Sequence, residues 1–134
     1  LLTEKVEAAE PLNCAALSVA RLLRIMHDRG VSHRDLKASN ILLANGREPT
    51  CIDLVGVRVG SSVPFRVRCK QLARLNASFL ADPAITRPAR LRFLQVYLAA
   101  GEYRLGNWKS WWLAISQATA AKQAKNRRSG RPLA

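Results

Sequence analysis

The most constraining feature of the sequence is a polar segment, His33-Arg34-Asp35-Leu36-Lys37-Ala38-Ser39-Asn40, set between apolar elements. Before it, apolar residues recur with helical spacing over residues 15–29, and Gly30 supplies a helix stop. After it, two short apolar segments within residues 31–54 flank the turn signal Asn45-Gly46. The sequence therefore predicts a mostly buried helix, then a polar loop, then a two-stranded β-hairpin.

The second half of the sequence is predicted to be helical. Thr86 is the expected N-cap of one helix, with Pro88 in its first turn. Residues 1–6 are expected to form a short strand or hinge, and the basic residues 125–134 a mobile tail. The fold class is therefore α+β and mainly helical, with one domain over residues 1–124. The predicted helices of the second half, together residues 70–124, are about 70–80, 87–100 and 108–124.

Charge is placed unevenly along the 134 residues. The net charge is +13, of which residues 66–134 carry +12. Such a basic region indicates an anionic neighbour, either a membrane surface, a nucleic acid or a phosphorylated substrate. The three cysteines are widely spaced without a Cys-x-x-Cys pair, which is typical of reduced thiols in a cytosolic protein. No apolar run reaches the roughly 18 residues that span a bilayer, and no signal peptide is visible.

The polar segment matches the pattern His-Arg-Asp-x-x-x-x-Asn, with a lysine two residues after the aspartate, which resembles the catalytic loop of kinases. Asp35 is the candidate to accept a proton from a substrate hydroxyl, and Lys37 to neutralise charge on a transferred phosphoryl group. Asn40 and Asp53 offer oxygen ligands that suit Mg²⁺. His33 and Arg34 are expected to brace the loop. Each residue alone would more simply be an exposed polar group, but their order and spacing favour the kinase-like interpretation.

The chain resembles the lipopolysaccharide kinase family, the Kdo and heptose kinases of Gram-negative envelopes, and specifically the C-terminal lobe of the protein-kinase-like fold. The resemblance implies ATP-dependent phosphorylation of a sugar hydroxyl of the lipopolysaccharide core, with ATP and Mg²⁺ as cofactors. It also implies a cytoplasmic protein in peripheral contact with the inner face of the inner membrane, where the acceptor and the leaflet are anionic. The residues that carry the resemblance are 33–40, 51–54, 71–76 and 90–94.

Two further segments fit this resemblance, each with a simpler alternative. Leu2–Val6 resembles the kinase hinge, whose backbone near Glu4 and Val6 would meet adenine; the alternative is an ordinary edge strand. The tryptophans of residues 108–112 could rest at a membrane interface; the alternative is that they pack the last helix onto the domain.

The sequence also departs from the kinase pattern. It has no Gly-x-Gly-x-x-Gly loop and no recognisable strand lysine with a helix glutamate, so the N-terminal lobe would lie outside this chain. Weak or absent catalysis is therefore expected of the isolated chain. Gln71 stands where a kinase helix often carries an aspartate that braces the catalytic loop, and a neutral amide should brace it less strongly. The glycine after Asp53 comes one position late, at Gly56.

Three classes of function follow. The first is a kinase, acting on a lipopolysaccharide sugar or on a protein hydroxyl. The second is an inactive kinase remnant, or pseudokinase, that binds a partner through its basic face. The third, nucleic-acid binding, is not expected, because the sequence has no zinc-finger, RNP or helix-turn-helix signature.

Overall fold

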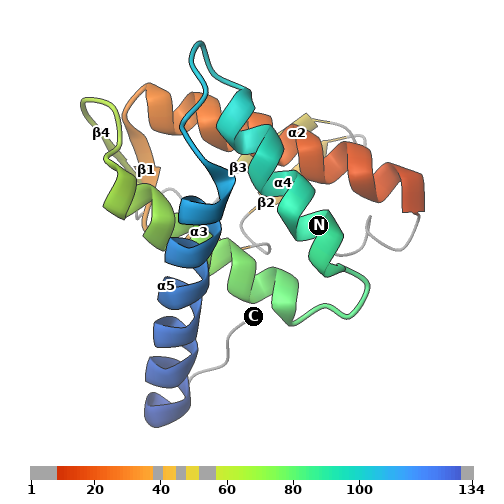
Figure 1. Ribbon diagram of the computed structural model, residues 1–134, viewed down its shortest axis with the longest axis vertical. Coiled ribbons are helices and arrows are strands. Elements are labelled where there is room, and N and C mark those ends of the chain that lie inside the picture. The colour runs from red at the N-terminus through yellow and green to blue at the C-terminus, as the bar shows by residue number, and fades with distance from the viewer. Residues whose placement is uncertain (1–8, 38–40, 45–47, 52–56, 131–134) are drawn as a thin grey trace.

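The computed structural model describes residues 9–37, 41–44, 48–51 and 57–130 of the chain. Four helices dominate this part, and two short antiparallel strand pairs lie beside them (Figure 1). The predicted α+β, mainly helical class is confirmed. The elements are α2 Ala9–Asp28, β1 Val31–His33, β2 Ile41–Ala44, β3 Glu48–Cys51, β4 Val57–Val59, α3 Phe65–Leu80, α4 Arg87–Ala99 and α5 Trp108–Ser129.

Helix α2 is longer than the pattern indicated, because it begins at Ala9 rather than near residue 15. Pro11 falls in its first turn, where the missing N–H has no intrahelical partner to lose. The helix ends as predicted, with Gly30 in the left-handed conformation at φ 79°. A β-carbon at Gly30 would overlap the carbonyl oxygen of Gly60, so the close approach of these two turns requires glycine.

The predicted hairpin is confirmed, with a shift of its second strand. Strand β2 pairs antiparallel with β3, and Ile41 lies opposite Cys51 while Ala44 lies opposite Glu48. The second strand therefore begins before Cys51. A second strand pair, β1 with β4, was not predicted, because Val57–Val59 is too short for a clear alternating pattern.

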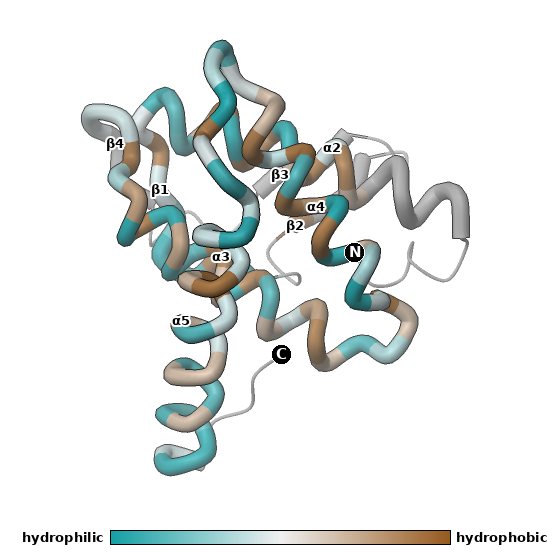
Figure 2. The backbone as a smooth tube through the Cα atoms, viewed as in Figure 1, coloured by the Kyte–Doolittle hydropathy of each residue, from teal (hydrophilic) through white to brown (hydrophobic). Residues whose placement is uncertain are grey.

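Helices α2 and α4 pack against each other, and α3 packs against α5, whose C-terminal turns extend away from α2 (Figure 1). Brown, hydrophobic segments of α2, α3 and α4 gather at the centre, whereas the distal turns of α5 are mostly teal to pale (Figure 2). None of the helices in the described ranges combines the length and the hydropathy of a membrane-spanning segment. The core contains, among others, Val19, Leu23, Leu36, Ile41, Leu72, Leu75, Phe79, Phe93, Leu98, Trp111 and Ile115.

The observed ends of α4 and α5 can be compared with the ends that the sequence predicted. Thr86 caps α4 as predicted, since its hydroxyl accepts a hydrogen bond from the N–H of Ala89 at 3.2 Å. Helix α5 continues to Ser129, so residues 125–129 belong to the helix and the expected tail boundary is corrected. Asn126 is buried there, and Gly130 ends the helix with φ 70°. The basic residues of this turn favour the helix, because cations near a C-terminus complement the helix dipole.

Candidate functional site

The predicted catalytic loop leaves the end of β1 and is pinned by two buried side chains. His33 is 1% exposed and Leu36 is fully buried in the core. Between them, Arg34 is exposed and the carboxylate of Asp35 is 44% exposed. The alternation holds the backbone against the helices while it presents the Asp35 carboxylate to solvent.

Two hydrogen bonds between residues that are close in sequence shape the loop itself. The backbone N–H of Asp35 donates to Nδ1 of His33 at 3.2 Å, and the N–H of Lys37 donates to the carbonyl oxygen of Asp35 at 3.0 Å. Because Nδ1 of His33 accepts a hydrogen bond, the ring carries no proton on that nitrogen in this arrangement. His33 therefore fixes the backbone immediately before the carboxylate.

Two cations flank the Asp35 carboxylate. Nζ of Lys37 lies 3.7 Å from Oδ2, and Nε of Arg74 lies 3.4 Å from Oδ1. Sequence reasoning did not assign Arg74 to the site, since nothing local connects two residues that are 39 positions apart. The one available signal was its helical spacing from Gln71, because residues three apart on a helix share a face.

Gln71 of α3 contacts the loop backbone directly. Its buried Oε1 accepts the N–H of His33 at 3.1 Å, and it lies 2.8 Å from Nε2 of His27. Since an amide oxygen only accepts, Nε2 of His27 must carry the proton. One neutral oxygen thus holds two N–H groups, one from the loop and one from the end of α2.

The hydrogen-bond chain continues from His27 into α4. Nδ1 of His27 lies 2.7 Å from the hydroxyl of Tyr97, which therefore donates to it, and Arg68 donates to the same hydroxyl oxygen at 3.3 Å. Burial lowers the pKa of His27 to about 4, while its hydrogen bond to Gln71 works in the opposite direction. Burial also raises the pKa of Tyr97 to about 12. Both groups are consequently neutral near pH 7.

Two buried arginines hold together the helices around the hydrogen bonds of His27 and Tyr97. Arg24 donates to the carbonyl oxygens of Tyr97 and Leu98 at 2.9 and 2.6 Å, which caps the end of α4. Its Nε pairs with Asp28 at 2.8 Å, and Arg68 pairs with the other carboxylate oxygen of Asp28 at 3.0 Å. The Asp28 carboxylate therefore joins α2, α3 and, through Arg24, α4.

Four of the predicted site residues lie outside the described part of the chain: Glu4, Val6, Asn40 and Asp53. Within the described ranges, no group of three or more His, Cys, Asp or Glu side chains could hold a metal ion. The described part therefore brings together Asp35, Lys37 and His33, and adds Arg74 and Gln71 to them.

Most of the chain matches a known protein family. Residues 1–97 match the lipopolysaccharide kinase (Kdo/WaaP) family, a stretch that includes the loop, the hairpin, α3 and most of α4. No curated protein matches the chain. The match covers well over half of the sequence and includes every residue predicted for the site. The chain belongs to the lipopolysaccharide kinase (Kdo/WaaP) family.

Proposed function

We propose that this chain is the C-terminal lobe of an ATP- and Mg²⁺-dependent kinase whose acceptor is a sugar hydroxyl of the lipopolysaccharide core. The observation that carries the proposal is the exposed Asp35 carboxylate, held between Lys37 and Arg74 on a loop tied to Gln71. The family supports a kinase role in general, and the basic second half of the chain suits an anionic glycolipid at the cytoplasmic face of the inner membrane.

Asp35 is the residue that would act on the acceptor. Its carboxylate would accept the proton of the sugar hydroxyl as that oxygen attacks the γ-phosphorus of ATP. The new bond joins the sugar oxygen to phosphorus, and the bond from phosphorus to the bridging oxygen breaks, so that ADP leaves with the electron pair. Lys37, 3.7 Å from the carboxylate, would lie close to the charge on the transferred group.

Arg74 and Gln71 would act as positioning residues. Nε of Arg74 lies beside Oδ1 of Asp35 and Nζ of Lys37 beside Oδ2, so Arg74 would help to hold the carboxylate with Oδ2 toward Lys37 and the acceptor. Gln71 fixes the backbone of His33, two residues before the base. Neither side chain needs to touch the substrate to influence the rate.

The residues proposed to hold magnesium are Asn40 and Asp53, with Glu4 and Val6 proposed at adenine. Amide and carboxylate oxygens are the donors that Mg²⁺ prefers. The pairing of Ile41 with Cys51 brings the two points from which the chain continues toward Asn40 and Asp53 to one end of the hairpin. When bound, the metal would neutralise phosphate charge during transfer.

A phosphotransfer assay tests the proposal. The full-length gene product would be incubated with labelled ATP, Mg²⁺ and lipopolysaccharide that lacks core phosphate, as Asp35→Asn and, for a matched control, Asp82→Asn in the exposed turn after α3. We expect Asp35→Asn to lower kcat about 10²- to 10⁴-fold, with the KM for ATP little changed. Unchanged turnover in Asp35→Asn would contradict the assignment of the base.

The same assay separates the alternatives. Label transfer to a protein in place of lipopolysaccharide would indicate a protein kinase. Full-length protein that binds its anionic partner yet transfers no phosphate with any acceptor would indicate a pseudokinase. The isolated chain is expected to be weak or inactive, because its sequence lacks a glycine-rich phosphate loop.

A further inference from the structure

A groove lies where the first turns of α4 and α5 meet, and its lining residues are far from the Asp35 loop in the sequence. It is lined by Arg87, Pro88, Leu91, Trp108, Lys109 and Trp112, and it offers about 460 Å³ to water-sized molecules. That volume falls within the range of roughly 300–1,000 Å³ that is typical of small-molecule sites. We call these six residues the α4–α5 groove.

The lining combines cations with aromatic surface and contains no acid. The guanidinium carbon of Arg87 lies 5.8 Å from the ring centre of Trp112, and Nζ of Lys109 lies 5.9 Å from that of Trp108. These contacts hold the two cations against the rings at the edge of the cation–π range. Among the residues that the structure describes, no carboxylate forms an ion pair with either cation.

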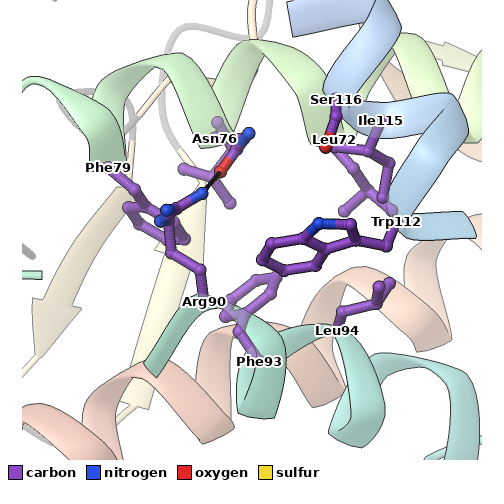
Figure 3. Close-up of a pocket in the computed structure, with 10 residues that line it drawn as sticks. Leu72, Asn76, Phe79, Arg90, Phe93, Leu94, Trp112, Ile115 and Ser116 are labelled. Carbon is purple, nitrogen blue, oxygen red and sulfur yellow. Dashed lines mark hydrogen bonds between the residues drawn. The ribbon is translucent and has the colours of Figure 1, made fainter. Parts of the chain in front are cut away.

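A third cation lies behind Trp112. Arg90 is 5.5 Å from the Trp112 ring and points into a narrow pocket between α3, α4 and α5, where it donates to Oδ1 of Asn76 at 3.3 Å (Figure 3). Its Nε is buried with no hydrogen-bond partner within the described part of the chain. Burial and the nearby charge of Arg87 both lower the pKa of Arg90, because each disfavours its positive charge.

The dipoles of α4 and α5 add to the positive potential at the α4–α5 groove. Neither α4 nor α5 has an acidic residue in its first turn, where acids ordinarily stabilise a helix. Arg87 and Lys109 occupy those turns instead, which is unfavourable for the free protein. A bound anion at the α4–α5 groove would offset both the dipoles and the cations.

The apolar part of the lining indicates what carries that anion. Pro88, Leu91 and the two tryptophans form the walls, and Leu113, one turn along α5 from Lys109, is 58% exposed. Tryptophan beside lysine and exposed leucine is typical of a membrane interface. The amphipathic indole ring suits the headgroup level, between the apolar lipid and the charged surface. A free phosphate ion would gain nothing from these walls.

We propose that the α4–α5 groove binds the phosphate headgroup of an anionic lipid, with Arg87 and Lys109 contacting the phosphate and Trp108 and Trp112 resting against the lipid. This inference deepens the proposed function, since it assigns the surface that would hold the kinase at the membrane. It is independent of catalysis, because binding requires neither ATP nor Asp35.

Vesicle binding tests the groove. The chain would be titrated with vesicles of phosphatidylcholine alone or mixed with phosphatidylglycerol, as wild type, as Arg87→Gln with Lys109→Gln, and as Lys125→Gln with Arg128→Gln. The last variant is the matched control, because it removes the same charge from exposed positions at the distal end of α5. Near an anionic surface each cation is worth about a factor of five, so the groove variant should bind about 30-fold more weakly.

Three outcomes decide the matter. The proposal holds if the mixed vesicles bind, the groove variant loses affinity and the distal variant loses much less. Equal losses in the two variants would overturn it, because they would indicate diffuse attraction to the whole basic chain. The proposal would also be overturned if inorganic phosphate bound as tightly as the mixed vesicles. Tighter binding of a duplex oligonucleotide, with the same dependence on Arg87 and Lys109, would overturn it as well.

A parallel measurement separates this inference from the proposed function. In the full-length gene product, Asp35→Asn is expected to bind the mixed vesicles like wild type while it loses phosphotransfer. Circular dichroism confirms that each variant is folded. In the wild-type full-length gene product, vesicle binding without phosphotransfer would support the groove and overturn the kinase assignment, whereas phosphotransfer without vesicle binding would support the kinase assignment and overturn the groove.

Discussion

The neutral state of His27 makes the stability of this domain depend on pH. Its side chain is fully buried, and its pKa is lowered from 6.5 to about 4, chiefly by desolvation. The folded pKa is below the unfolded one, so between these values the unfolded chain binds more protons. The contribution of neutral His27 to the free energy of unfolding is therefore fully present above about pH 6.5 and is lost as the pH falls toward 4.

The size of the effect follows from the pKa difference. A difference of about 2.5 units corresponds to about 3 kcal/mol, and roughly 2 kcal/mol of it is already lost at about pH 5. That loss is a large part of the roughly 5–15 kcal/mol that stabilises a typical domain. Protonation at Nδ1 would also remove the acceptor that Tyr97 uses, because the imidazolium can only donate.

Urea unfolding followed by circular dichroism measures this dependence. Wild type and His27→Gln would be compared at about pH 7 and about pH 5, since the glutamine keeps a donor and an acceptor but does not titrate. The wild-type free energy of unfolding should fall by about 2 kcal/mol more than that of the variant over this interval. Equal falls in the two proteins would refute the reasoning, because acid destabilisation would then come from other groups.

Two further substitutions test the contacts around the loop. Gln71→Leu leaves the N–H of His33 and the Nε2–H of His27 without their acceptor and should cost about 2–4 kcal/mol in urea unfolding; Gln95→Leu, at an exposed position of α4, is the control, and equal costs in the two variants would argue against the hydrogen bonds. Gly101→Ala places a β-carbon where the Arg24 guanidinium lies, so it should cost about 2–3 kcal/mol; an unchanged unfolding midpoint would show that Arg24 can move without loss.

The sequence predicted elements best where the signals were local. Thr86 and Gly30 are strong end signals, and Asn45-Gly46 lies between the two strands that do pair. Two helix ends were misplaced, at Ala9 and at Ser129, and at the second the glycine stop is Gly130, beyond the expected boundary at residue 124. Trp111 is buried against Tyr97 and Phe65, so packing explains it, whereas Trp108 and Trp112 are partly buried against the core and their contact with a membrane stays a prediction.

The candidate site was predicted as a motif but not as a structure. The spacing of His33 to Asn40 identifies the loop, because the residues that carry the chemistry are neighbours in sequence. Arg74, His27 and Tyr97 carry no such spacing, since each reaches the loop or its support from another helix. Contacts between distant segments depend on the packing of α2, α3 and α4, which cannot be recognised from local patterns in one sequence.

The role of Gln71 shows how the structure changes one of these interpretations. A neutral amide in place of a carboxylate was expected to brace the loop less strongly, and a single hydrogen bond to it is weaker. However, a carboxylate beside His27 would favour the imidazolium and place a charged pair in a buried site, at the cost of desolvating both groups. The amide avoids that cost, because its one oxygen satisfies the N–H of His33 and a neutral His27 together. Burial therefore sets the low pKa of His27, and glutamine at position 71 accepts from the neutral imidazole without adding a charge that would favour its protonation.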